Sequence, residues 1–262
     1  MGYLEFVTAM VKTTRNWAVI GLVWVAICQG ANAYADVPKH LTVAEDLVTR
    51  LNGVDDNHYG GGNRHIDWDA TPPTARSVCS SFISLLLIKA YGLTDADIAK
   101  MGSGSNPKAE DYFGAVGKGK AFERISKVRH LRAGDFLFVK YTDGHVSRNG
   151  VEDTGHVMLV ASTPERTDKI GEAPVGTDVF TIEVIDSSAS GHGTHDTRHI
   201  GKNKFTGGVG KGTLRIAVNP TTDEIAAYSW SDLVKSEYFS APNRVLIGAR
   251  LNLNFFQGGG SR

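Results

Sequence analysis

The apolar residues of the chain change their spacing about halfway along, from a helical to an extended pattern. In residues 41–51 they recur at every third or fourth position, as on one face of an amphipathic helix. Thr42 and Glu45 have the spacing of a capping box at the start of this helix. Beyond residue 131, short apolar runs are separated by polar turns, which is typical of strands. They predict strands at 136–141, 157–161, 179–186, 213–218 and 245–251.

Between these regions lies a segment that is apolar on every face. Residues 85–88 are four consecutive aliphatic side chains, and a helix that is apolar all round belongs in the interior of a domain. Gly92 provides a helix stop. Cys79 lies in the first turn, where free backbone N–H groups and the helix dipole favour an anion. The segment therefore predicts a buried helix with a thiol at its positive end.

The order of the predicted elements favours an α+β domain with a mainly antiparallel sheet, because helices come first and strands follow. Short helices are predicted at 109–116 and 121–128, and a glycine- and histidine-rich loop at 187–212. Residues 53–76 are predicted to be a long loop. A loop of this length that leads into a buried helix is more often functional than idle.

The N-terminus resembles an export signal. Lys12 and Arg15 precede an apolar run from Trp17 to Cys28, and small residues follow as far as Ala35. The run has 12 residues, whereas a bilayer span needs about 20. We expect residues 1–35 to be a cleaved signal peptide, with an uncleaved anchor as the alternative. A single domain is expected at 36–256, followed by a frayed tail at 257–262.

Charge and cysteine content narrow the function classes. The chain has 28 basic and 28 acidic residues. Removal of the signal takes away two basic residues and one acidic residue, so the mature chain stays nearly neutral. This charge gives no reason to expect binding to nucleic acid or to an anionic membrane. Cys28 leaves with the signal, so Cys79 remains as a single thiol. It is either a small buried hydrophobe or a nucleophile. An unpaired thiol in an exported protein favours the nucleophile.

A cysteine nucleophile needs a base and a group that orients the base. His156 is the preferred base because it begins a strongly apolar strand, whereas its alternative, His145, lies in a polar turn. Asp186 ends the next strand and is expected to orient the imidazole ring. His192 and His195 are the substitutes for this orienting role.

The remaining candidates are oxyanion, substrate and metal groups. The backbone N–H of Cys79 and the Tyr59 side chain are the expected oxyanion donors. Arg198 is a candidate to pair with a substrate carboxylate. His192, His195 and His199 suggest a metal site, but they lie in a flexible glycine-rich loop without further ligands. We therefore expect neither a metal nor a cofactor.

These motifs together resemble a known superfamily. The order is Tyr-Gly-Gly from residue 59, Cys-Ser-Ser-Phe from 79, Gly-Asp-Phe-Leu-Phe from 134, Gly-His-Val-Met-Leu-Val from 155, and an acidic residue closing the next strand. It resembles a divergent branch of the papain-like cysteine amidohydrolases of bacterial cell walls, the NlpC-like and CHAP groups. The resemblance implies a papain-like fold, with N-terminal helices and the nucleophile helix packed on a mainly antiparallel sheet. It also implies Cys79 as nucleophile, His156 as base, Asp186 as third member and Tyr59 at the oxyanion site.

The resulting expectation is an exported cysteine amidohydrolase or peptidase that hydrolyses amide bonds, with peptidoglycan stem peptides as the substrate. We expect a monomer in the bacterial periplasm or outside the cell, without nucleic-acid partners and without stable membrane insertion after signal cleavage. Two alternatives remain open: a thiol-dependent acyl or amide transferase, and a catalytically silent module that binds cell wall.

Overall fold

A computed structural model of the chain describes residues 37–62, 64–146, 152–168, 171–202 and 204–257. It is 35% strand and 22% helix. The helices in these ranges are α1 (Lys39–Leu51), α2 (Cys79–Tyr91), α3 (Asp95–Ala99), α4 (Ala109–Gly117) and α5 (Asn254–Gln257), with a 3₁₀ turn at Val128–His130. The strands are β1 (Asn57–Tyr59), β2 (His65–Asp67), β3 (Thr74–Ser77), β4 (Phe122–Ile125), β5 (Phe136–Tyr141), β6 (Gly155–Val160), β7 (Glu165–Arg166), β8 (Asp178–Ser188), β9 (His199–Gly201), β10 (Lys204–Phe205), β11 (Gly208–Val218), β12 (Ile225–Ser229), β13 (Tyr238–Phe239) and β14 (Arg244–Leu251).

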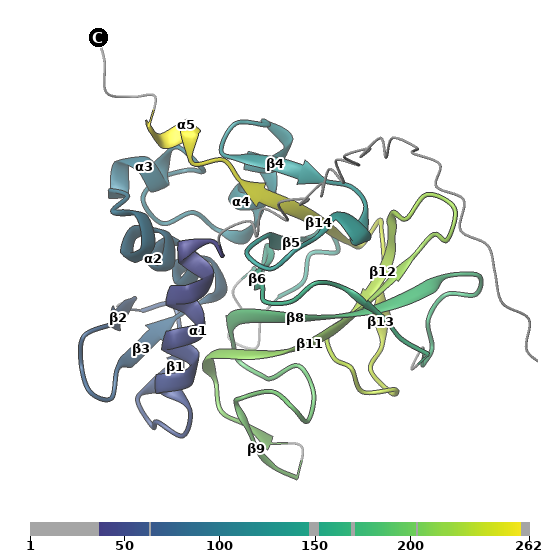
Figure 1. Cartoon of the computed structure of the whole chain (residues 1–262), viewed down its shortest axis with the longest axis horizontal. Coiled ribbons are helices and arrows are strands. Elements are labelled where there is room, and N and C mark those ends of the chain that lie inside the picture. Colours follow the sequence, from purple (N-terminus) through teal and green to yellow (C-terminus); the bar gives the residue numbers. More distant parts are fainter. Residues whose placement is uncertain (1–36, 63, 147–151, 169–170, 203, 258–262) are drawn as a thin grey trace, which may run out of the picture. The chain divides into compact units, whose positions relative to one another are not determined.

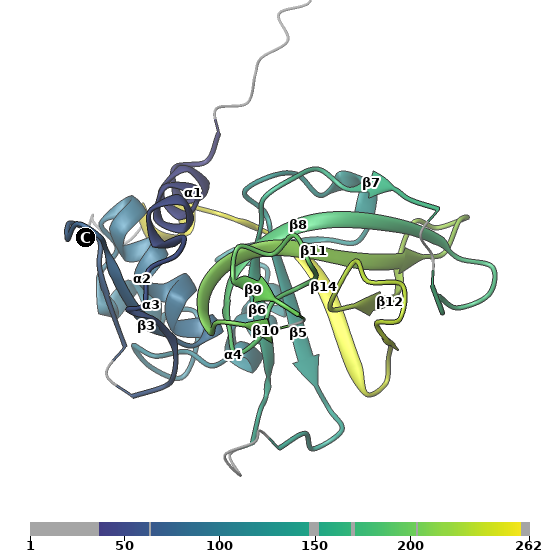
Figure 2. The ribbon, with the colours of Figure 1, turned by 90° about the horizontal axis from the view of Figure 1, so that it is seen from below.

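Most strands belong to one large antiparallel sheet. Among the described residues its order is β13-β12-β11-β8-β6-β5-β14-β4, and β7 pairs with β8 beside this path. β8 and β11 are the two long strands, and they pair along their whole length (Figure 2). Two smaller sheets accompany the large one: β1-β3-β2 and β9-β10. In the first of these, β1 and β3 run parallel.

This architecture shows that the predicted papain-like α+β fold is wrong. The protein is β-rich, with three sheets in its described part and few helices. The difference arises in segments that carry no periodic pattern. The expected loop at 53–76 contains β1, β2 and β3, the expected helix at 121–128 is replaced by β4 and the 3₁₀ turn, and the expected loop at 187–212 contains β9, β10 and the start of β11.

The central helix is confirmed. Helix α2 spans Cys79–Tyr91 and ends at Gly92, whose positive φ of 67° lets its N–H bond to the Ile88 carbonyl at 2.8 Å. Most of its residues are buried, and it contacts α1, β6 and β8 (Figure 1). The predicted capping box of the first helix is wrong, because α1 begins at Lys39 and Thr42 is already inside it.

The hydrophobic core lies between the helices and one face of the large sheet. It joins α1, α2 and α4 to β4, β5 and β6, and a second cluster covers the other face beneath β11 and β12. Tyr112 and three phenylalanines meet at tilted, stacked and edge-on angles inside the first cluster. Each fully buried side chain of this size stabilises the fold by about 1.5–3 kcal/mol. In the same core α2 packs against β6, the strand that carries His156.

Two sequence predictions fall outside this description. The signal peptide at 1–35 and all but the first residue of the tail at 257–262 lie outside the described residues, and Gln257 is the last residue of α5. Across the described ranges, every helix is too short or too polar to cross a bilayer.

Candidate active site

Cys79 occupies the first position of α2. The preceding residue, Val78, is extended, and its N–H donates to the Ser81 hydroxyl at 2.9 Å, which fixes the start of the helix. The first backbone N–H groups of a helix have no partner within it and attract negative charge. The Cys79 residue is 6% exposed. The thiol is therefore held at the positive end of a rigid helix.

The segment that leads into α2 is held by one carbonyl group. β1 pairs with β3 so that Tyr59 lies opposite Ser77, two residues before Cys79. The Ser77 carbonyl accepts hydrogen bonds from the Gly60 N–H at 3.1 Å and the Ser187 hydroxyl at 2.8 Å. This carbonyl ties β1, β3 and β8 together beside the thiol.

His156 is the second residue of β6, and the glycine before it is required by the packing of the strand. Gly155 has a φ of +143°, and a Cβ at this position would lie 2.0 Å from the Val139 carbonyl oxygen on β5. β5 therefore approaches the start of β6 too closely for any side chain. This contact fixes the backbone from which the His156 ring projects, opposite Val139 in the ladder.

The His156 ring interacts with both Cys79 and Asp186. Its Nε2 lies 2.5 Å from Asp186 Oδ2, and the Cys79 side chain is its other hydrogen-bond and charge partner. Burial alone disfavours the imidazolium, but the charge of Cys79 and the hydrogen bonds that the ring makes to Asp186 and Cys79 outweigh it and raise the pKa of His156 to about 10. The surroundings of the ring therefore favour the imidazolium form of His156.

Asp186 is fully buried and has two partners besides His156, namely His192 and Arg198. His192 Nε2 lies 2.9 Å from the same oxygen, Oδ2, and Arg198 Nη1 lies 2.9 Å from Oδ1 at an angle outside that of a hydrogen bond. Burial by itself raises the pKa of this carboxyl. The charges of His192 and Arg198 and the hydrogen bonds from both histidines overcome that effect and hold the pKa well below its usual range. Asp186 is therefore an ionised hub.

Arg198 links this hub to a second buried carboxylate. It forms a two-pronged pair with Asp196, with Nε–Oδ1 at 2.8 Å and Nη2–Oδ2 at 2.7 Å. His192 Nδ1 lies 2.8 Å from the Trp230 carbonyl oxygen, so the ring is held between that carbonyl group and Asp186. Buried charges persist when they are paired in this way.

Glycines in β11 make room for this network. Gly210 lies directly opposite Asp186 in the β8–β11 ladder, and Gly212 lies two residues further along the same face. A Cβ at Gly210 would lie 2.5 Å from Arg198 Nε, and one at Gly212 would lie 2.3 Å from Asp196 Oδ2. The guanidinium and its carboxylate partner therefore fill the space that side chains of β11 would otherwise take.

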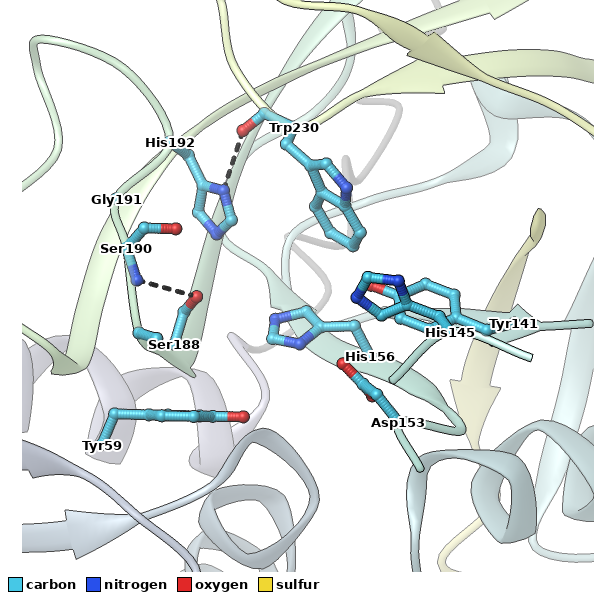
Figure 3. A pocket seen from close by; sticks show the side chains of 11 residues that line it. Tyr59, Tyr141, His145, Asp153, His156, Ser188, Ser190, Gly191, His192 and Trp230 are labelled. Atoms are coloured by element: carbon cyan, nitrogen blue, oxygen red, sulfur yellow. Dashed lines mark hydrogen bonds between the residues drawn. The ribbon is translucent and has the colours of Figure 1, made fainter. Parts of the chain in front are cut away.

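A pocket of about 450 Å³ opens beside these groups. Figure 3 shows the imidazole rings of His156 and His192 and the indole of Trp230 around it, with Tyr59 on the opposite side. Trp230 stacks on His192 at 6.1 Å and meets His156 edge-on at 5.3 Å between ring centroids. The lining residues are Tyr59, Tyr141, His145, Asp153, His156, residues 188–191, His192 and Trp230. Cys79 does not line the pocket, but it interacts electrostatically with two residues that do, Tyr59 and His156.

The structure thus brings Cys79, His156, Asp186 and Tyr59 into interaction with one another, and their catalytic roles stay predictions. Arg198 is placed differently from its prediction as a substrate-binding residue. Its side chain is 1% exposed and points to Asp186 and Asp196, because these two buried carboxylates require a cation. His145, the alternative base, lines the pocket from an exposed turn and stacks edge-on with Tyr141.

Several residues that line the pocket were not predicted to do so from the sequence, among them Trp230, Asp153 and His192. Trp230 and Asp153 lie in segments without a periodic pattern, and His192 was considered only as a substitute orienting group or metal ligand. The signal that sequence reasoning could have used is the alternation of glycine at 208, 210 and 212. Glycines at every second position of a strand leave one face bare for close packing.

A metal could be held by His156, Asp186 and His192, whose ligand atoms lie within 4.8 Å of one another. This group differs from the predicted histidine cluster and shares only His192 with it. An ion here would have to displace both hydrogen bonds to Asp186 Oδ2 and would face the Arg198 guanidinium on the other carboxylate oxygen. The donor set is therefore better satisfied by protons than by a metal.

The site is a buried cysteine–histidine–aspartate chain beside a pocket in a β-rich fold. No family model matches the chain, and no solved structure matches it. The chain is 31% identical over 180 residues to the uncharacterized protein R653 of Acanthamoeba polyphaga mimivirus, an alignment that covers 67% of this chain and 77% of that protein. The chain belongs to the same family as that viral protein.

Proposed function

We propose that the protein is a cysteine amidohydrolase that cleaves amide bonds through a thioester intermediate. The observation that carries this proposal is that the His156 ring interacts with the Cys79 side chain and with the Asp186 Oδ2 atom. A thiolate becomes a useful nucleophile when a neighbouring imidazolium stabilises it and a third group orients that ring. Cys79, His156 and Asp186 supply these three roles.

The proposed reaction proceeds in two steps. The Cys79 sulfur attacks the amide carbonyl carbon, and the carbonyl π electrons move onto oxygen. The C–N bond then breaks as the His156 imidazolium gives its proton to the leaving amine. In the second step water attacks the thioester, its proton passes to the imidazole, and the C–S bond breaks to release a carboxylic acid and restore the ion pair.

The oxyanion of each tetrahedral intermediate needs hydrogen-bond donors. The Cys79 N–H at the start of α2 is one proposed donor, and the Tyr59 hydroxyl is the other. Burial raises the pKa of Tyr59, and the nearby charges of Cys79, Asp153 and Asp186 raise it further, so the phenol keeps its proton at neutral pH. A protonated phenol donates to an oxyanion.

We place the substrate in peptidoglycan stem peptides and the protein in the periplasm or outside the cell. Support for this placement comes from the export signal predicted at residues 1–35 and from the resemblance of the residue motifs to cell-wall amidohydrolases. The pocket volume of about 450 Å³ lies within the range of about 300–1,000 Å³ that holds small ligands. It suits one or two amino-acid residues on either side of a scissile bond.

The test is digestion of purified peptidoglycan and of defined muropeptides, with the products identified by mass. Cys79→Ala and Cys79→Ser should abolish product formation, because both remove the thiolate. Ser80→Ala is the matched control, since Ser80 is the next residue of α2 and is also 6% exposed. Full activity of a folded Cys79→Ala protein contradicts the proposal.

Two further variants assign the base and its orienting group in the same assay. His156→Ala should lose nearly as much activity as Cys79→Ala, whereas Asp186→Asn should lose less, since orienting groups are partly replaceable. His145→Ala should retain activity, and a loss equal to that of His156→Ala would make His145 the base. Digestion with added glycinamide separates hydrolysis from acyl transfer, because only a transferase gives the glycinamide adduct as main product.

A further inference from the structure

We propose that Asp153 determines the specificity of this pocket by binding an ammonium group that the substrate carries close to the scissile amide. The inference rests on the proposed amidohydrolase and adds its substrate class: amides or peptides with a free amine within one or two residues of the cleaved bond. It is carried by the charge, the position and the aromatic surroundings of the Asp153 carboxylate.

Asp153 is not part of the buried network of Asp186, Arg198 and Asp196. Among the described residues that line the pocket, it is the one Asp, Glu, Lys or Arg. The described part of the chain offers it no ion-pair partner within 4.0 Å, whereas Asp186 has Arg198 and two histidines. Its carboxylate Oδ1 accepts the Gly155 N–H at 3.2 Å, which fixes the side chain beside the pocket. A half-buried carboxylate in this setting attracts a cation.

The field of this carboxylate extends across the pocket. Burial is the main reason that the pKa values of Tyr59 and Tyr141 are raised, and the negative charge of Asp153 contributes in both cases. Tyr59 and Tyr141 belong to different elements, β1 and β5, and both line the pocket (Figure 3). Asp153 therefore acts electrostatically on two separate walls of the pocket.

The aromatic walls favour the same kind of ligand. Tyr141 and Trp230 join Tyr59 around the cavity, and a cation above an aromatic face gains about 0.5–2 kcal/mol. The two histidines nearest Asp186 do not offer an opposing anion site. His156 is occupied by Cys79 and Asp186, and both ring nitrogens of His192 are occupied by Asp186 and Trp230.

The position of Asp153 sets the distance between the ammonium group and the reacting carbonyl. Asp153 precedes His156 by three residues, so their backbones are at most about 10 Å apart. One residue of an extended substrate covers about 3.3 Å. An ammonium bound by Asp153 therefore belongs to the residue at the scissile bond or to one of its nearest neighbours.

The experiment compares paired substrates: short peptide amides with a free amine near the cleaved bond, and the same peptides acetylated on that amine. Asp153→Asn should reduce kcat/KM for the free-amine form by about 10- to 100-fold, as expected for a lost hydrogen bond to a charged group, and should leave the acetylated form unchanged. Glu152→Gln is the matched control, because Glu152 is the exposed neighbour and does not line the pocket. Asp153→Lys should remove the preference for the free amine altogether.

Binding provides a readout that does not need turnover. Calorimetry with Cys79→Ala protein should show tighter binding of the free-amine peptide, and the added Asp153→Asn change should abolish the difference. Equal loss for both peptide forms, or no loss for either, overturns the assignment of Asp153. Failure of the amidohydrolase appears separately, as peptide cleavage that survives Cys79→Ala.

Discussion

The protonation state of His156 offers the most direct physical test of the site, because it depends on the neighbouring thiol. In the intact protein the pKa of this imidazole is raised from 6.5 to about 10. At about 1.4 kcal/mol per pH unit, the site stabilises the imidazolium relative to the neutral ring by about 5 kcal/mol more than water does.

Cys79→Ala removes the largest of the influences that raise this pKa. Burial of the ring remains and favours the neutral form, while the hydrogen bond that the ring donates to Asp186 remains and favours the charged form. A single opposite charge at this range changes a pKa by about 1 to 3 pH units. We therefore expect the pKa of His156 to fall by that amount in Cys79→Ala, and the ring to begin losing its proton correspondingly nearer to neutral pH.

The measurement is a pH titration of ¹⁵N-histidine-labelled protein by long-range ¹H–¹⁵N NMR, with His156→Gln used to assign the signals. His40 is the internal control. Burial lowers its pKa, and its ring nitrogens face the Tyr91 hydroxyl and the Gly134 carbonyl. It should titrate identically in both proteins. A His156 ring that titrates at the same pH with and without Cys79 refutes the ion pair, and so does a ring that is neutral at pH 8 in the intact protein.

Two further predictions test access to the thiol and the buried charges. Iodoacetamide should label Cys79 in the native protein within minutes at pH 7, below the value of about 8.5 at which an ordinary thiol ionises, and His156→Gln should slow this labelling. Peptide mapping by mass spectrometry measures the labelled fraction. Labelling that occurs only after unfolding contradicts the ion pair. Arg198→Met should lower the free energy of unfolding by about 3–5 kcal/mol, because it leaves buried carboxylates unpaired. Arg166→Met, whose ion pair with Asp178 is exposed, should lower it by less than about 1 kcal/mol, and equal losses in urea unfolding contradict a special role for Arg198.

The parts of the fold that could be predicted from sequence are those with long apolar runs. Helix α2 and strands β5, β6, β8, β11 and β14 each contain such a run, and all were predicted with small differences in their ends, except that β11 begins five residues earlier, at Gly208. The apolar residues of these elements face a shared core, so their pattern reflects burial directly. Cys79, His156 and Asp186 lie at or near the ends of three of these elements, which is why their proximity could be expected.

The short strands could not be predicted, and this is why the fold class was wrong. β1, β2 and β9 have three residues each, too few to display an alternation of apolar and polar positions. β1 is in addition held by a partner distant in the sequence, because the Asn57 side chain bonds to both the N–H and the carbonyl of Val209 at 2.8 Å. Pairing between such segments depends on tertiary context rather than on local propensity.

The role of Arg198 illustrates what a loop sequence conceals. An arginine among glycines and histidines has no pattern that separates a solvated side chain from a buried one, and so its expected partner was a substrate.

The buried partner of Arg198 follows from electrostatics instead. A carboxylate that orients a catalytic imidazole from a fully buried position must stay ionised, and burial opposes that state. Hydrogen bonds from two histidines reduce the penalty, and a permanent cation such as guanidinium secures it at every pH at which the protein is folded. The Arg198 side chain then has to fit against β11, the strand that pairs with β8 opposite Asp186. Only glycine at position 210 leaves space for it. The bare face of β11, the arginine and the ionised aspartate are therefore three parts of one requirement, and the segment beyond Asp186 belongs to the site as fully as the segment before it.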